Sequence, residues 1–140
     1  MSASAPPALE YCSFIFLDKK KVLVEKRRSD RENNAGNTDF PGGKIEPGET
    51  SEQALHREVK EELGVVLNEF SYLGTLRLQL REGSCDWHCF AVHKWTGEIK
   101  ANEAEQLLWL PLKSLKSQLK LWWDRVMVDV LLEQHFKKSG

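Results

Sequence analysis

The sequence predicts a mixed α/β sandwich in which two helices pack against a β-sheet. Runs rich in β-forming residues cover positions 10–18, 21–27, 70–80, 86–95 and 107–111. One capped helical segment interrupts these runs, and an amphipathic helix follows the last of them. Strands, a helix, more strands and a second helix within 140 residues are typical of one mixed domain.

The connections between these elements are also visible in the sequence. Residues 18–21 form a hairpin connection, and a polar loop over 28–39 leads through FPGGKI into the first helix. Turns are expected at 81–84 and at Thr96-Gly97, and a polar turn precedes the final helix. That helix is indicated by apolar side chains at helical intervals, namely Leu119, Trp122, Trp123, Val126, Met127, Val130 and Leu131.

The first helix has clear start and stop signals. Thr50 is the expected N-cap, and Gln53 three residues later completes a capping box. Gly64 takes the position just past the last helical turn, where a left-handed conformation is common. Leu55, Val59 and Leu63 form the apolar stripe that we expect to face the core.

The same helix carries an unusual concentration of carboxylates. Glu58, Glu61 and Glu62 fall within about one third of the helix circumference, where like charges repel. Hard divalent cations such as Mg²⁺ take oxygen ligands of this kind and leave positions open for substrate phosphate oxygens. Arg57 is expected to hold Glu49 through a bidentate ion pair that fixes the preceding loop against the helix.

The segment from Gly43 to Val65 resembles the Nudix box, G-x5-E-x7-R-E-U-x-E-E-x-G-U, in which U is aliphatic. Every position fits, and the matching residues are Gly43, Glu49, Arg57, Glu58, Val59, Glu61, Glu62, Gly64 and Val65. A solvent-exposed acidic helix would explain the charges but not this spacing. The resemblance implies a Nudix-type α/β/α sandwich with a mixed β-sheet and a Nudix-box loop-helix-loop. It also implies an enzyme that hydrolyses phosphorus-containing acid anhydrides with Mg²⁺, or alternatively Mn²⁺.

The resemblance also assigns catalytic and metal-binding roles. The metal ligands are expected to be Glu58, Glu61, Glu62, Gly43 and Glu103. Arg57 and Glu49 are expected to support catalysis by holding the loop. For the general base we favour Glu103, in the acidic loop before the strand at 107–111, over its neighbour Glu105. Glu61 is the other candidate, because a carboxylate beside a cation can accept a proton from bound water.

Substrate-binding residues are expected around the glycine turn. Gly42 and Gly43 lack a Cβ, which would let backbone amides approach phosphate oxygens, and Lys44 adds a positive charge. Arg27 and Arg28 end a strand, and alternation allows only one of them to face the site. Asp39 lies just before the glycine turn and is a further candidate.

Beyond the box, the chain is similar to MutT-type pyrophosphohydrolases, which cleave nucleoside triphosphates to monophosphates and pyrophosphate and often act on oxidised guanine nucleotides. Two base-reading positions differ: Asp124 stands where that branch has Asn, and Gly83 where it has Arg. Asp124 would accept hydrogen bonds from guanine or cytosine N–H groups, and Trp122 or Trp123 would stack on the base.

Charge and composition limit the other interpretations. A net charge of −1 gives no general attraction to duplex nucleic acid or membrane, and no apolar run is long enough to span a bilayer. We expect a flexible tail over 1–8 and a single domain over 9–138, as a cytoplasmic monomer or homodimer. Three cysteines fit a reducing compartment.

The cluster CDWHC suggests a zinc site, but Cys85 and His88 would point to opposite faces of a strand and no fourth ligand is apparent. No catalytic role is assigned to His56, His93 or His135. Alternative functions are a Nudix hydrolase of dinucleoside polyphosphates, nucleotide sugars or RNA 5′ ends, a nucleotide-binding module without turnover, and a structural acidic-helix domain.

Overall fold

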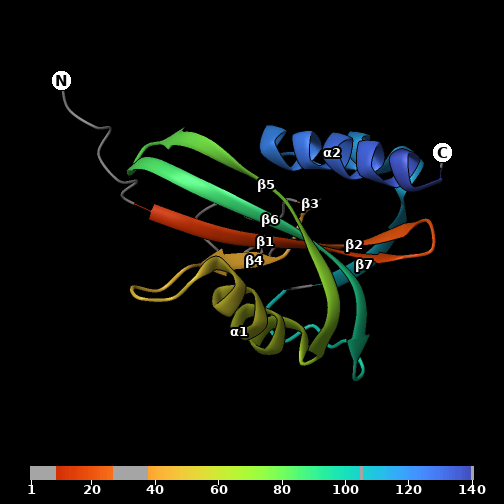
Figure 1. Ribbon diagram of the computed structural model, residues 1–140, viewed down its shortest axis with the longest axis horizontal. Helices are drawn as coiled ribbons and strands as arrows, with labels where there is room; N and C mark the ends of the chain where they lie inside the picture. Colours follow the sequence, from red (N-terminus) through yellow and green to blue (C-terminus); the bar gives the residue numbers. More distant parts are fainter. Residues whose placement is uncertain (1–8, 27–37, 105, 140) are drawn as a thin grey trace.

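The computed structural model describes residues 9–26, 38–104 and 106–139, and the side chains up to residue 134. It confirms the α/β architecture (Figure 1). The elements are β1 (Leu9–Asp18), β2 (Lys21–Lys26), β3 (Thr38–Asp39), β4 (Gly42–Lys44), α1 (Ser51–Leu63), β5 (Val66–Leu80), β6 (Gly83–Thr96), β7 (Gln106–Pro111), the 3₁₀ helix η1 (Leu112–Gln118) and α2 (Trp122–Ser139). No helix in the described ranges is long and apolar enough to cross a membrane.

The strands form one mixed sheet whose main order is β3-β2-β1-β6-β5. β1 and β6 run parallel, whereas β1 pairs antiparallel with β2 and β4. β7 returns to pair antiparallel with β2 along its whole length. This arrangement brings β4 itself and the segment before β7 beside α1.

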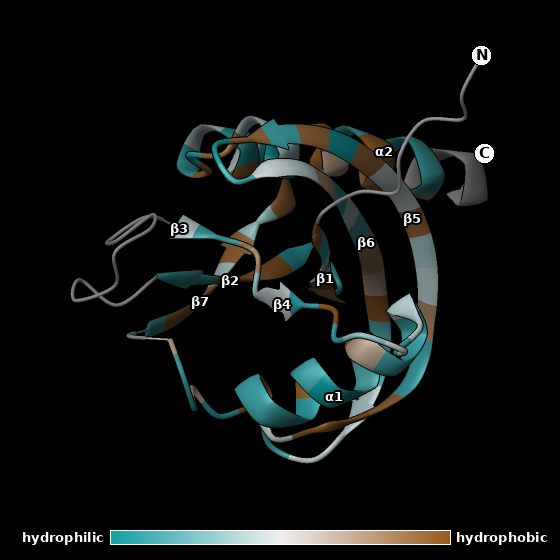
Figure 2. Cartoon of the chain, turned by 90° about the vertical axis from the view of Figure 1, so that its left-hand side faces the viewer, coloured by the Kyte–Doolittle hydropathy of each residue, from teal (hydrophilic) through white to brown (hydrophobic). Residues whose placement is uncertain are grey.

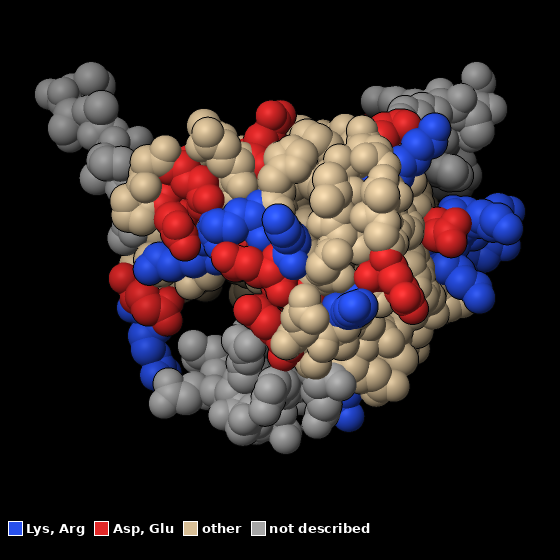
Figure 3. All heavy atoms as spheres, turned by 90° about the horizontal axis from the view of Figure 1, so that it is seen from below, with Lys and Arg blue, Asp and Glu red and all other residues tan. Residues whose placement is uncertain are grey.

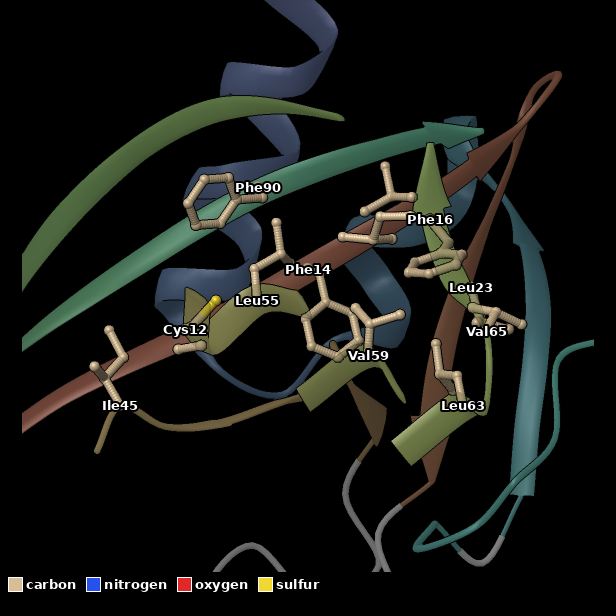
Figure 4. Close-up of a cluster of buried hydrophobic side chains, with 13 residues drawn as sticks. Cys12, Phe14, Phe16, Leu23, Ile45, Leu55, Val59, Leu63, Val65 and Phe90 are labelled. Carbon is tan, nitrogen blue, oxygen red and sulfur yellow. The ribbon is translucent and has the colours of Figure 1, made fainter. Parts of the chain in front are cut away.

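The two faces of the sheet bury separate cores, because successive side chains of a strand point to opposite faces. Phe14, Phe16 and Leu23 belong to the core under α1, part of which Figure 4 shows. Ile15 and Val22 belong to the core under α2 and η1. Figures 1 and 2 show α1 and α2 on opposite sides of the sheet, which confirms the predicted sandwich.

The predicted signals at both ends of α1 are confirmed. The main-chain amide of Gln53 donates to Thr50 Oγ1 at 3.1 Å, and the main-chain amide of Thr50 donates to the side-chain Oε1 of Gln53 at 2.9 Å. Gly64 adopts φ 73°, a left-handed conformation that costs glycine little, and its amide donates to the Lys60 carbonyl at 3.0 Å. The predicted stripe, namely Leu55, Val59 and Leu63, is buried.

Several predicted boundaries are wrong. β5 begins at Val66 rather than at residue 70, because register irregularities around Glu69 let the strand continue past it. β6 begins at Gly83, so the turn is shorter than predicted. The predicted polar turn before the last helix contains η1, and Leu119 lies in extended backbone after it rather than in α2. The side chains that α2 buries in the core are Met127, Val128 and Leu131.

Candidate active site

Arg57 joins the loop before α1 to the helix. Its Nε donates to Glu49 Oε2 at 2.7 Å and its Nη2 donates to Glu49 Oε1 at 2.8 Å, which confirms the predicted bidentate pair. Nη2 also donates to the Lys44 carbonyl at 3.0 Å. The Arg57 guanidinium lowers the pKa of Glu49 to about 2, and the Glu46 amide adds to this effect. The Lys44 side chain itself is exposed.

Arg57 also contacts two of the carboxylates predicted to bind metal. Its Nη1 donates to Glu58 Oε1 at 2.8 Å and to Glu61 Oε2 at 3.2 Å. Glu58 is buried, whereas the Glu61 side chain is half exposed. In Figure 3, which views the molecule from the α1 side, acidic and basic side chains alternate across this face. Arg57 therefore offsets the repulsion between neighbouring carboxylates on the helix.

Glu62 is the most strongly perturbed group of this face. It is 5 % exposed, and its Oε2 has no hydrogen-bond partner among the described residues. Burial raises the pKa of Glu62 far above its ordinary value, and the charges of Glu25, Glu58 and Glu103 raise it further. Burial likewise raises the pKa of Glu58, against the lowering effect of Arg57. Like charges and burial therefore both oppose ionisation of Glu62.

A divalent cation fits this donor set, because it would offset the like charges and give the buried Glu62 oxygen a partner. The ligands are not preassembled: within the described ranges, no three Asp, Glu, His or Cys side chains already form a group that could hold a metal. Glu58 and Glu61 are instead bound to Arg57. The predicted ligand roles of Glu58, Glu61, Glu62 and Glu103 stay predictions.

The glycine turn has a packing role that the sequence did not reveal. A Cβ at Gly43 would lie 2.3 Å from the carboxylate of Glu58, and a Cβ at Gly42 would lie 2.3 Å from the carbonyl oxygen of Cys12. Both glycines belong to β4, which pairs with β1. The space beside each glycine is thus filled by protein atoms, so Gly43 is needed to let Glu58 approach the turn. Phosphate binding at these residues stays a prediction.

The segment after β6 folds onto the C-terminal end of α1. The Lys100 amide donates to the Leu63 carbonyl at 2.9 Å, and the Asn102 amide donates to the Glu62 carbonyl at 3.1 Å. Glu103 follows directly and is exposed. Our sequence reasoning missed Asn102, because nothing local identifies its partners. It also missed Glu25, although a single acid within the apolar run KVLVEK was a usable signal.

Asp124 lies on the other side of the sheet, in the first turn of α2. It is 1 % exposed, and its Oδ2 accepts a hydrogen bond from the Phe40 amide at 3.3 Å. Burial raises the pKa of Asp124 to about 7, and the charge of Glu25 adds to this effect. The charge of Glu25 thus contributes to the raised pKa of both Glu62 and Asp124. Asp39 is buried, and its Cα lies opposite that of Glu25 in the antiparallel β2–β3 ladder.

Aromatic side chains surround the start of α2. Trp123 makes a tilted contact with Trp87 at 5.7 Å between ring centroids, and Trp87 stacks on Tyr11 at 5.1 Å. The Trp87 Nε1 donates to Ser13 Oγ at 2.8 Å. Trp123 Nε1 is buried and has no partner among the described residues, whereas Trp122 is 51 % exposed.

Three predicted residues lie outside what the structure describes: Arg27, Arg28 and Glu105. The side chain of His135 is likewise outside the described part. In the CDWHC segment, Thr75 Oγ1 lies 2.8 Å from His88 Nδ1, and Glu10 Oε1 lies 3.2 Å from its Nε2. His88 therefore bridges β1, β6 and β5 through hydrogen bonds.

Comparison with known proteins identifies the class that this fold and carboxylate face define. The profile of the NUDIX domain matches residues 7–131. The chain belongs to this family and is a Nudix pyrophosphohydrolase. It is 32 % identical over 100 residues to an Escherichia coli protein named 8-oxo-dGTP diphosphatase, covering 71 % of this chain and 77 % of that protein.

A second curated relative has a different name. The chain is 33 % identical over 89 residues to the CTP pyrophosphohydrolase of Escherichia coli, covering 64 % of this chain and 65 % of the relative. Among solved structures, it resembles the E. coli ORF135 protein with a TM-score of 0.80 and 25 % identity, covering 91 % of this chain and 90 % of that one. These similarities confirm the Nudix-type fold.

Proposed function

We propose that this protein is a Mg²⁺-dependent pyrophosphohydrolase that cleaves a nucleoside triphosphate to the monophosphate and pyrophosphate. Mn²⁺ would be an alternative cofactor. Candidate substrates are cytosine nucleotides and guanine nucleotides, oxidised forms included. The names of two relatives, an 8-oxo-dGTP diphosphatase and a CTP pyrophosphohydrolase, support both bases. Three cysteines without disulfide partners fit a cytoplasmic location.

The observation that carries the proposal is the burial of Glu58 and Glu62 on one face of α1, where Glu62 Oε2 has no hydrogen-bond partner among the described residues. Burying several carboxylates together is costly unless a cation or protons compensate them. Glu58, Glu61, Glu62, Glu103 and the main chain of Gly43 would hold the cation. When bound, a divalent cation polarises the phosphoryl group and lowers the pKa of a bound water.

The protein's own residues would orient this chemistry. Arg57 holds Glu49 and the Lys44 carbonyl, which fixes the loop against the first carboxylate of α1. Glu103 is favoured as general base, because it is exposed, whereas Glu61 Oε2 already accepts a hydrogen bond from Arg57. Arg57 and Glu49 would thus support the reaction without exchanging a proton.

The other end of the substrate would meet the surroundings of Asp124. With a pKa near 7, Asp124 is present in both protonation states at neutral pH. The ionised form only accepts hydrogen bonds, which suits the N–H groups of guanine. The neutral form both donates and accepts, which suits cytosine, whose N3 acceptor and N4 amino donor are neighbours on its pairing edge. The ionised form would disfavour uracil and thymine, whose pairing edge places carbonyl acceptors on both sides of a single N–H group.

Steady-state kinetics with a nucleotide panel tests the proposal. The panel should contain CTP, dCTP, GTP, dGTP, 8-oxo-dGTP, UTP, dTTP and ATP, with a dinucleoside polyphosphate, a nucleotide sugar and a capped RNA as rivals. We expect Mg²⁺-dependent turnover and the highest kcat/KM on a cytosine or guanine triphosphate. Preferred turnover of a rival substrate would overturn the substrate assignment, and nucleotide binding without turnover would overturn the catalytic role.

A further inference from the structure

Asn102 holds the C-terminal end of α1 through two different donors. Its main-chain amide donates to the Glu62 carbonyl at 3.1 Å, and its side-chain Nδ2 donates to the Glu61 carbonyl at 3.1 Å. The last carbonyls of a helix have no partner within the helix and must find one elsewhere. Asn102 therefore binds the main chain of two residues whose side chains belong to the carboxylate face.

The chemistry of this contact requires an amide side chain. A carbonyl accepts hydrogen bonds only, so Asp at this position would place an acceptor against an acceptor, and Ala would leave the Glu61 carbonyl without this bond. Gly64 lies beside the contact, and a Cβ there would be 3.6 Å from Asn102 Nδ2, an ordinary van der Waals distance, so its φ of 73° rather than space favours glycine.

Glu103 depends on this contact for its position. It follows Asn102 directly, is exposed, and lies in an irregular segment between β6 and β7. Its main chain continues directly from the Asn102 amide that donates to the Glu62 carbonyl, so the segment holds Glu103 beside the C-terminal end of α1. The Lys100 and Asn102 bonds to α1 are contacts that explain this placement.

We propose that Asn102 is a positioning residue, which fixes Glu103 beside Glu62 by binding the Glu61 and Glu62 carbonyls. Metal affinity and turnover then depend on Asn102, although its side chain contacts neither metal nor substrate. This inference rests on the proposed function, in which Glu103 serves the metal site. Its role resembles that of residues behind metal ligands, whose loss typically weakens affinity or activity by about 10- to 100-fold.

A double-mutant cycle on Mn²⁺ affinity tests the inference directly. Mn²⁺ binding to the full-length protein is measured by water-proton relaxation for the wild type, Asn102→Ala, Glu103→Gln and the double variant. We expect Asn102→Ala to weaken Mn²⁺ binding by roughly 5- to 10-fold, and the double variant to bind no more weakly than Glu103→Gln alone, within about twofold. Asn102→Asp should bind Mn²⁺ more weakly still than Asn102→Ala.

Asn68→Ala is the matched control. Asn68 Nδ2 donates to Thr96 Oγ1 at 2.7 Å. This bond joins β5 to β6 and involves neither α1 nor the segment that carries Glu103. Asn68→Ala should lose similar thermal stability and keep wild-type Mn²⁺ affinity. Three results would each overturn the inference. Asn102→Ala could bind Mn²⁺ with wild-type affinity, Glu103→Gln could leave the Mn²⁺ affinity unchanged, or the losses of Mn²⁺ affinity in the two single variants could add in the double variant.

The same variants separate this inference from the proposed function. Absence of nucleotide turnover by the wild type would reject the proposed function, and the Mn²⁺ cycle would still decide the role of Asn102. If the wild type is active, kcat/KM should fall in Asn102→Ala by the same roughly 5- to 10-fold factor, mainly through kcat at subsaturating metal. Excess Mg²⁺ should then restore part of the lost activity.

Discussion

Replacing Asp124 with Asn should change how the stability of the protein depends on pH. Asp124 is buried and accepts a hydrogen bond from the Phe40 amide. Asn has the same shape and can accept that bond through its side-chain oxygen, but it cannot ionise. The variant therefore removes the cost of a buried negative charge and keeps the contact that joins α2 to Phe40.

The sign and size of the effect follow from the pKa. The folded protein raises the pKa of Asp124 from 3.8 to about 7, so the folded state holds this proton more tightly than the unfolded state. Its stabilising contribution is complete below the unfolded pKa and is lost as the pH rises through about 7. At about 1.4 kcal/mol per pH unit, the cost of ionisation grows by roughly 2–3 kcal/mol between pH 4.5 and pH 8.

Urea denaturation of the wild type and Asp124→Asn across this pH range measures the effect. The stability of the variant relative to the wild type should rise by roughly 2–3 kcal/mol from pH 4.5 to pH 8. An unsatisfied Asn amide would cost stability at every pH, so only the change with pH is diagnostic. Asp129→Asn is the control, because Asp129 lies on the same helix and is exposed. If the free energies of unfolding of the wild type and Asp124→Asn changed in parallel with pH, Asp124 would not have the raised pKa on which this prediction depends.

The remaining predictions concern the active site and substrate choice. Glu58→Gln or Glu62→Gln should lower kcat/KM at least ~10²-fold, which corresponds to about 2.7 kcal/mol of transition-state stabilisation. Circular dichroism should show that the fold is retained. Near-normal turnover would mean that these carboxylates do not belong to the metal site. Arg57→Lys cannot reproduce the bidentate contact with Glu49, so activity should fall roughly tenfold or more, and full activity would reduce the pair to a surface ion pair. Gly43→Ala should displace the Glu58 carboxylate, since the added Cβ would lie 2.3 Å from it, and wild-type kinetics would contradict that packing. Asp124→Asn should also redistribute kcat/KM among bases by about 1–3 kcal/mol, whereas an unchanged base profile would leave Asp124 with the structural role alone.

Local signals predicted α1 and its surroundings well. The capping box of Thr50 and Gln53, the left-handed Gly64 and the Arg57–Glu49 pair all lie within a short stretch of chain. Each depends on backbone geometry and nearby donors, which the sequence spacing determines. The same reasoning explains why the hairpin between β1 and β2 was also predicted correctly.

Features that depend on distant segments were missed or misinterpreted. Asn102 finds its partners on α1, about 40 positions earlier in the chain, and Glu25 reaches the carboxylate face only because β2 lies within the sheet. The space beside Gly43 is filled by Glu58, a contact that turn propensity does not reveal. The burial of Asp124 against Phe40, which accompanies its raised pKa, is likewise a tertiary property that the sequence does not reveal.

The identity of the phosphate product decides whether this protein is a Mg²⁺-dependent pyrophosphohydrolase of nucleoside triphosphates. The wild type is incubated with CTP and with dGTP in the presence of Mg²⁺, and the products are followed by ³¹P NMR, with a parallel sample in excess EDTA. We expect pyrophosphate and the nucleoside monophosphate in the first sample and no hydrolysis in the second. Release of orthophosphate and a nucleoside diphosphate, or turnover that persists in EDTA, would contradict this expectation.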